Sequence, residues 1–206
     1  MNFLAFNFTI PEVAGYLSAV AMLWSFIPYI RDIFKGKTKP ERASWLIWAI
    51  LGAILFFSQL AKGASYSLFM PAAQGIGDLF IFVLAIKYGM GGFLKRDIIA
   101  LTGASVGLFL WYLTREATVA LLIAVFIDAT GATLTVIKSY EHPTSETISN
   151  WVLGVFAGLL SCIAVGNYNL ILLIFPVYVC LACLSVLTAI SLGFRRKKIL
   201  STKNGK

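Results

Sequence analysis

The sequence predicts an all-α integral membrane protein with seven transmembrane helices, arranged as two three-helix bundles joined by a linker helix. The first observation is composition. Of 206 residues, 59% are hydrophobic and the mean hydropathy is +0.86, which is more apolar surface than a soluble domain of this size can bury. The second observation is a set of seven apolar segments, each near the roughly 20 residues that cross a bilayer. The third is an internal repeat with an offset of 103 residues.

The predicted spans fill almost the whole chain, so no separate soluble domain fits. Their bounds are about 11–33, 43–61, 65–87, 98–114, 117–138, 146–166 and 168–194. The predicted division is a first repeat at 1–95, a linker helix at 96–116, a second repeat at 117–194 and a basic cytoplasmic tail at 195–206.

The repeat is visible where each bundle turns from its first to its second span. The matching residues are Lys35, Pro40 and Trp48 in the first copy and Lys138, Pro143 and Trp151 in the second. Both copies lie between two apolar segments, and a third apolar segment follows. Internal repeats of this kind are the usual way in which membrane transporters build a central solute site between two similar halves.

Basic residues fall on one side of this seven-span arrangement. Of the 17 Lys and Arg residues, only Lys62 and Arg115 lie on the side of the N-terminus. Because cytoplasmic loops collect Lys and Arg, the N-terminus is predicted outside and the C-terminus in the cytoplasm. The net charge of +8 is therefore attributed to topology and to anionic lipid at loops 34–44 and 138–147, and not to nucleic acid.

Neither catalysis nor metal binding is predicted. Cys162, Cys180 and Cys183 lie inside apolar spans and are interpreted as small buried side chains. His142 is the only histidine, and one histidine forms neither a metal site nor a catalytic triad. Since no HExxH motif, Ser-His-Asp set or phosphate loop occurs, we expect no enzyme activity, no metal and no cofactor.

Two carboxylates lie deep in apolar sequence. An ionised carboxylate in lipid costs at least about 2.5 kcal/mol, so Asp78 and Asp128 are expected to face the interior or a wet cavity. Gln74 lies four residues before Asp78, and both therefore project from one helix face. These side chains are predicted to contact a polar solute, and the alternative is that they only tie helices together. Asp128 is also a candidate proton carrier, because a desolvated carboxylate can exchange a proton near neutral pH.

The repeat also aligns breaks in the two first spans. At the constant offset of 103 residues, Pro28 aligns with Gly131 and Ser25 aligns with Asp128. Proline or glycine inside a membrane helix permits a bend, so Pro28, Tyr29 and Gly131 are candidates for a hinge or gate. A static kink is the alternative.

Pro28, Lys35, Lys37 and Thr38 together resemble the signature of the SWEET and PQ-loop transporter superfamily. The resemblance covers the whole chain, since these proteins carry two parallel three-helix bundles joined by a linker helix, with the N-terminus outside. This chain departs from the family pattern at Pro28-Tyr29, where the family has Pro-Gln.

The resemblance implies further solute contacts. Gln74-x-x-Gly77 is similar to an Asn-x-x-Gly whose Asn contacts sugar, and Phe57 stands where the family has a sugar-stacking Trp. The place of a second solute-contacting Asn falls on Tyr178 or Cys183. Some relatives are proton-coupled carriers, and others are sorting receptors that bind peptides without solute flux.

The predicted function is that of a SWEET-like carrier in the plasma membrane, which moves a sugar or similar small polar solute by alternating access. A proton-coupled carrier of amino-acid type and a receptor of the same fold are the alternatives, and the fold leaves room for a homo-oligomer. The predicted solute contacts are Gln74, Asp78, Phe57, Ser25 and Asp128. Trp45, Trp48 and Trp151 are expected to anchor helices at the cytoplasmic interface.

Overall fold

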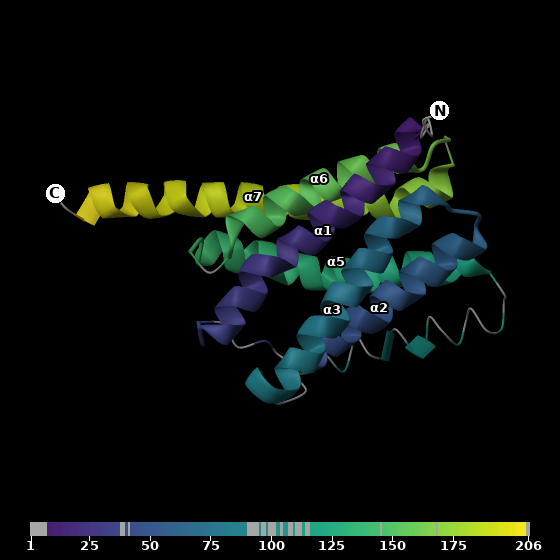
Figure 1. Cartoon of the computed structure of the whole chain (residues 1–206). Helices are drawn as coiled ribbons and strands as arrows, with labels where there is room; N and C mark the ends of the chain where they lie inside the picture. Colours follow the sequence, from purple (N-terminus) through teal and green to yellow (C-terminus); the bar gives the residue numbers. More distant parts are fainter. Residues whose placement is uncertain are drawn as a thin grey trace, which may run out of the picture.

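The chain folds into helices, and the residues described contain no β-strand. The computed structural model describes residues 8–37, 40, 42–89, 116–144, 146–167 and 169–204, and the single positions 95, 98, 102, 103, 105, 106, 109 and 113. The helices (Figure 1) are α1 (Ile10–Phe34), α2 (Arg42–Ala61), α3 (Phe69–Tyr88), α5 (Ala117–Glu141), α6 (Ile148–Ala164) and α7 (Leu170–Asn204), with a 3₁₀ turn, η1 (Tyr66–Leu68), before α3. The prediction of an all-α protein is confirmed.

Local sequence explains where several helices begin and end. The Thr9 hydroxyl accepts a hydrogen bond from the backbone N–H of Glu12 at 3.4 Å, which caps the start of α1. The Asn169 side chain accepts from the N–H groups of Ile171 and Leu172, which caps α7. α2 and α6 each end at a glycine with positive φ, Gly63 at 82° and Gly166 at 73°. These two glycines are 103 residues apart, the offset of the sequence repeat.

Three helical stretches are long and apolar enough to cross a membrane: Ile10–Phe34, Tyr66–Tyr88 and Leu170–Ile199. Three shorter stretches, Trp45–Ala61, Ala117–Ala129 and Ile148–Ala164, are also apolar. These lengths and compositions, taken over the described residues, are those of a membrane protein.

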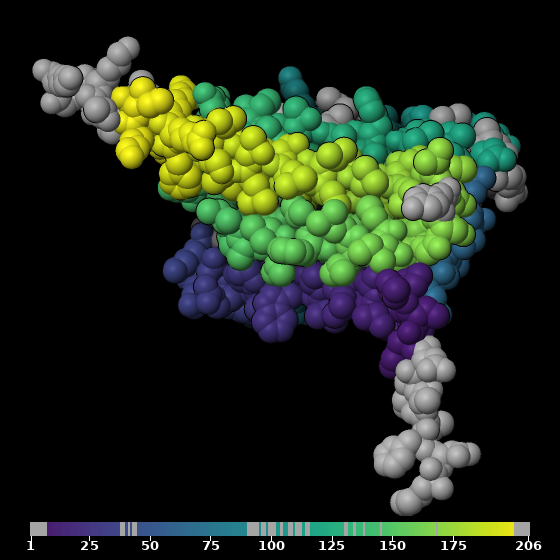
Figure 2. Space-filling model, turned by 90° about the horizontal axis from the view of Figure 1, so that it is seen from above, coloured from purple at the N-terminus to yellow at the C-terminus, as the bar shows by residue number. Residues whose placement is uncertain are grey.

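The six helices form a ring. Each helix packs mainly against two others, and the contacts close in the order α1, α6, α7, α5, α2, α3. α1, α3, α5 and α7 run in one direction, while α2 and α6 run in the other (Figure 1). Figure 2 shows α1, α6, α7 and α5 side by side along one face. Exchanging α1, α2 and α3 for α5, α6 and α7 leaves the order of contacts unchanged.

We name the two ends of the ring by the start of the chain: the end at which α1 begins is called outer, and the opposite end is called inner. The outer end carries the start of α1 and the turns at Gly63 and Gly166, and the inner end carries the end of α3 and the exit of α7. Large apolar side chains cover the outward faces of the helices, which suits contact with lipid. Examples are Val20, Trp24 and Ile27 on α1, Ile76, Phe80 and Val83 on α3, Phe126 on α5, Phe156 and Ile163 on α6, and Leu181 and Leu184 on α7.

Glycines bring the second and third helices of each set close together. A Cβ atom added at Gly52 of α2 would lie 2.8 Å from the Cα of Gly75 in α3, so the two backbones touch. Between α6 and α7 the glycines face thiols, and Gly158 also approaches the backbone of α7, where an added Cβ would lie 3.0 Å from the carbonyl oxygen of Pro176. A Cβ at Gly154 would lie 2.5 Å from Cys183 Sγ. The corresponding distance from Gly158 to Cys180 Sγ is 2.6 Å.

The C-terminal segment of the predicted division is helical. The segment expected as a basic tail, 195–206, continues α7 as helix through Asn204 (Figure 1). Arg and Lys are good helix formers, and neither glycine nor proline interrupts the segment from Arg195 to Asn204. The predicted linker helix at 96–116 lies mostly outside the described residues.

Candidate functional site

Polar side chains of α3 face the interior of the ring. Asp78 is 4% exposed, and its Oδ2 atom has no hydrogen-bond partner. Gln74 lies one turn earlier on the same helix face, and its Oε1 atom is also buried without a partner. The expectation that Asp78 faces inward agrees with this burial. Unsatisfied buried polar atoms are rare in folded proteins, so a pair of them on one face marks a candidate binding site.

A second carboxylate reaches the same region from α5. The hydroxyl of Tyr178 in α7 donates a hydrogen bond to Asp128 Oδ2, with an oxygen–oxygen distance of 2.5 Å. Asp78 and Asp128 are close enough for their charges to interact, and Cys183 lies within the same range of Asp128. The site therefore joins α3 to α5 and α7, which belong to the second half of the chain. Tyr178 and Cys183 were the two positions suggested for a solute contact in the last span.

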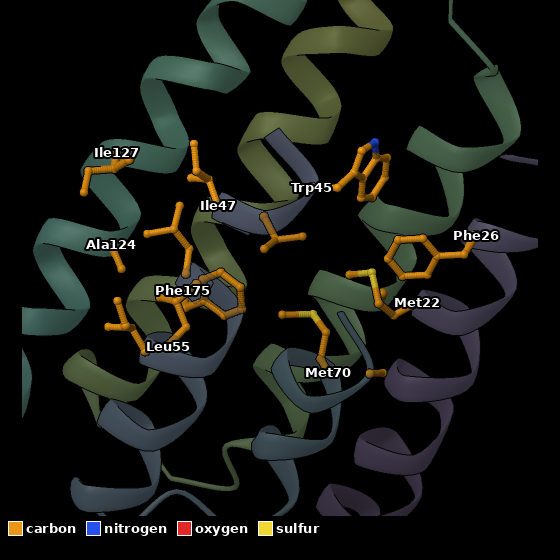
Figure 3. Close-up of a cluster of buried hydrophobic side chains, with 14 of the residues drawn as sticks. Met22, Phe26, Trp45, Ile47, Leu55, Met70, Ala124, Ile127 and Phe175 are labelled. Atoms are coloured by element: carbon orange, nitrogen blue, oxygen red, sulfur yellow. The ribbon is translucent and has the colours of Figure 1, made fainter. Parts of the chain in front are cut away.

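Apolar side chains close the interior on the outer side of these polar groups. Leu55, Met70 and Phe175, from α2, α3 and α7, are each at most 1% exposed and belong to one hydrophobic cluster. Figure 3 shows Leu55 beside Phe175, with Met70 in the neighbouring part of the cluster. We call these three side chains the outer collar. By their positions along α2, α3 and α7, they lie nearer to the outer end of the ring than the carboxylates do.

Aromatic side chains fill the interior on the inner side. The ring of Trp45 lies 5.1 Å from that of Tyr29, 6.5 Å from that of Phe26 and 5.0 Å from that of Trp48. We call these four residues the inner aromatic cluster, and Figure 3 shows Trp45 and Phe26 within it. The expectation that Trp45 anchors α2 at the lipid interface is wrong, because this side chain is only 9% exposed and packs inside the ring.

The remaining predicted residues lie in different surroundings. Ser25 is buried, and its hydroxyl donates to the carbonyl oxygen of Met22 in its own helix. Pro28 lies within α1 and Gly131 within α5, both of which continue as helix through these positions, and the hinge stays a prediction. Phe57 is 58% exposed on the outward face of α2, so it does not line the interior. The structure therefore does not bring Phe57 to the carboxylates, and it gives the Ser25 hydroxyl a partner within α1.

One interior polar residue was not anticipated from the sequence. Gln59 in α2 is 0% exposed, and neither its amide nitrogen nor its amide oxygen has a partner. The sequence did carry a signal for it, because Ile47, Leu51, Leu55 and Gln59 recur every four residues and form one inward stripe. Its position near Lys62, at the end of the span, makes it resemble an interfacial residue.

The site offers hydrogen-bond donors and acceptors but no metal-binding cluster. Within the described residues, no group of three or more His, Cys, Asp or Glu side chains is arranged to hold a metal ion. The chemistry available is therefore hydrogen bonding and charge from two carboxylates, a carboxamide and a phenol. No family model, curated protein or solved structure matches the chain.

Proposed function

We propose that this protein is an integral membrane carrier that moves a small polar solute by alternating access, in the manner of the SWEET and PQ-loop transporters that it resembles. The observation that carries the proposal is the enclosed polar group formed by Gln74, Asp78, Asp128 and Tyr178. It lies between the outer collar and the inner aromatic cluster, where the two sets of three helices face each other.

The energetics of these side chains support a solute-binding role. Burying a polar group without a hydrogen bond costs about 2–7 kcal/mol, depending on the reference state. Gln74 and Asp78 each bury such an atom. A solute that carries hydroxyl, amide or ammonium groups would satisfy them, because both unpartnered atoms, Gln74 Oε1 and Asp78 Oδ2, are oxygens that can accept a hydrogen bond.

The helix ring supports the alternating-access part of the proposal. Contacts between α1 and α6 and between α2 and α5 join the two sets of helices, and the exchange of the sets leaves the pattern unchanged. Rocking of one set against the other around a fixed central site would part Phe175 from Leu55 and Met70 in one state. In the other state it would draw the inner aromatic cluster, whose four residues all belong to the first set, away from the second set. The proposed setting is the plasma membrane, with the N-terminus outside and the basic end of α7 in the cytoplasm.

A specific observation favours proton coupling as a second candidate. Asp78 and Asp128 interact, and neither forms an ion pair with a cation of the described residues. Two carboxylates in an apolar interior offer acceptor oxygens to a proton or a cation that travels with the solute. A proton-coupled carrier would use this pair, with the Tyr178 hydroxyl as the donor to Asp128.

A peptide-binding receptor of the same fold is less well supported. Such a receptor would need membrane-embedded cations to hold a carboxylate. The Lys and Arg residues of α1, α2, α3 and α5 all lie in the first or last turn of their helices, at Arg31, Arg42, Lys87 and Lys138. In α7 they begin at Arg195, where the helix leaves the ring.

Uptake by the purified protein in liposomes tests the proposal. Radiolabelled sugars and amino acids are screened with and without an inward proton gradient, and protein-free liposomes give the leak. We expect uptake of at least one solute, and Asp78→Asn is expected to reduce it about tenfold or more, as the loss of a hydrogen bond to a charged group would do. The matched control is Asp32→Asn, because Asp32 lies at the end of α1 beside the exposed Arg31.

The outcomes distinguish the three candidates. A gradient dependence that disappears in Asp128→Asn would support proton coupling, and an unchanged dependence would dismiss it. If no solute in the screen enters while the protein binds a peptide tightly, the receptor alternative replaces the carrier.

A further inference from the structure

A second group of buried polar side chains lies beyond the outer collar. Gln59 of α2, Ser67 of η1 and Ser161 of α6 are all 0% exposed. The Ser161 hydroxyl donates to the backbone carbonyl of Ser67 at 3.4 Å, while the Ser67 hydroxyl and both amide atoms of Gln59 have no partner. η1 contacts both α2 and α6, so it joins the two sets of helices at this level.

Helix geometry gives the depth of this group relative to the central site. Gly52 and Gly75 touch where the antiparallel helices α2 and α3 cross. Gln59 lies seven residues further along α2, which is about 10 Å closer to the outer end. Gln74 lies beside that contact, and Asp78 is about 5 Å deeper. Leu55 of the outer collar is one turn below Gln59 on the same stripe of α2.

A charged pair lies beyond the end of α2, closer to the outer end than Gln59. Lys62, three residues after Gln59, forms an ion pair with Glu116 at 3.0 Å, and both side chains are partly exposed. Gln59 is thus placed between a charged rim and an apolar collar. Its carboxamide has no hydrogen-bond partner there. A leucine or methionine of similar size would fill the same space without burying an unpaired polar group, so packing alone does not explain a glutamine at this position.

We infer that Gln59, together with Ser67 and Ser161, forms an outer subsite that binds the uncharged hydrogen-bonding part of the solute before it passes the outer collar. The inference rests on the carrier function proposed above. A carboxamide and two hydroxyls carry no charge, so the subsite suits hydroxyl, amide or neutral amine groups. Gln59 and Gln74 then present the same chemistry at two successive depths.

Uptake kinetics and stability together test the role of Gln59. The proteins are the full chain and its Gln59→Leu, Gln59→Asn and Ser18→Ala variants in liposomes, with radiolabelled D-glucose, L-lysine and L-glutamate as probes. Ser18 is the matched control, because it is equally buried but its hydroxyl donates within its own helix to the carbonyl of Gly15. We expect Gln59→Leu to raise the half-saturating concentration about tenfold, the loss of one hydrogen bond. Gln59→Asn should recover part of the loss and Ser18→Ala should match the wild type.

The melting temperature in detergent separates binding from structure. We expect Gln59→Leu to melt at the wild-type temperature or above it, because no hydrogen bond is lost. A fall of more than about 3 °C would mean that the amide is bonded within the protein, and the subsite would be rejected. Normal uptake by Gln59→Leu would also reject the subsite while leaving the carrier intact.

Thiol labelling tests whether position 59 can be reached from outside, without any measurement of transport. A membrane-impermeant methanethiosulfonate added from outside should modify Gln59→Cys at least tenfold faster than wild type, whose three native thiols give the background. Leu60→Cys is the control, since Leu60 is the neighbouring outward-facing position.

If none of the three probes enters the liposomes, the carrier proposal fails for them. Labelling of Gln59→Cys then still supports a water-accessible outer site, and its absence overturns it.

Discussion

The two sets of three helices share a path through the ring but differ in what holds them together. α2 meets α3 through the backbones of Gly52 and Gly75. α6 meets α7 through Gly154 against the Cys183 thiol and through Gly158 against both the Cys180 thiol and the backbone at Pro176. The outer turns after α2 and α6 are alike, since Gly63 and Gly166 both have positive φ at the repeat offset. Backbone course is thus preserved between the two sets, and the packing atoms are not.

The polar groups differ between the sets in the same way. The offset of 103 residues aligns Ser25 with Asp128. In the third helix of each set, aligning Pro71 with Pro176 gives an offset of 105 residues, and this offset aligns Asp78 with Cys183. The first set therefore supplies its carboxylate from α3 and the second from α5. Of these two carboxylates, Asp128 has a donor, the Tyr178 hydroxyl. Similar scaffolds can thus build an asymmetric interior.

The largest expected effect is at the backbone contact of the first set. Gly52→Ala should lower the free energy of unfolding by about 2 kcal/mol, because the new Cβ meets the Cα of Gly75 and backbone cannot rotate away. Equilibrium unfolding in detergent micelles measures this change. Gly75→Ala is the control. Its Cβ would lie 3.5 Å or more from α2, so stability should be unchanged or slightly higher. Equal losses of stability in the two variants would contradict the close approach of position 52 to the α3 backbone.

The next effect concerns the hydrogen bond between two helices of the second set. Tyr178→Phe removes the donor to Asp128 and should cost about 1.5 kcal/mol of stability. In Asp128→Asn the same hydroxyl loses a charged acceptor, so the two substitutions should be less than additive when combined. Unfolding of both single variants and the double variant gives the coupling energy. Strict additivity would show that the two side chains act independently.

The smallest effect is at the thiol contact of the second set. Gly154→Ala should cost about 1 kcal/mol, because its Cβ meets Cys183 Sγ at 2.5 Å. This clash is with a side chain, so trimming that side chain in Gly154→Ala/Cys183→Ala should restore most of the loss. The same unfolding measurement is used, with Cys183→Ala alone as the reference. A double variant less stable than either single variant would contradict the proposed packing.

Sequence reasoning reached the helical class and most helix bounds, and it placed Asp78 in the interior. Composition and apolar length carry that information, because every buried backbone group must be satisfied within a helix. The Tyr178–Asp128 bond was beyond reach, since it joins residues 50 positions apart whose contact depends on how α5 packs against α7. Trp45 was assigned to the interface from its place in the chain, whereas its burial depends on the aromatic rings of α1.

The stripe containing Gln59 shows a different limit. A glutamine near a lysine at a span end has the composition of an interface, and only its four-residue spacing from Leu55 indicates an inward direction. Phe57 was placed by resemblance alone, and the rotation of α2 that buries Leu55 and Gln59 turns Phe57 outward.

The length of α7 has a mechanical consequence. Its 35 residues make a rod of about 52 Å, well beyond the roughly 30 Å of a hydrocarbon core. Measured from Pro176, which lies inside the continuous helix near its outer end, the remaining arm is about 42 Å long. A tilt of about 10° at that proline would displace Asn204 by about 7 Å. A spin label or fluorophore near residue 200 would therefore amplify small motions of the last helix into distances that spectroscopy can resolve.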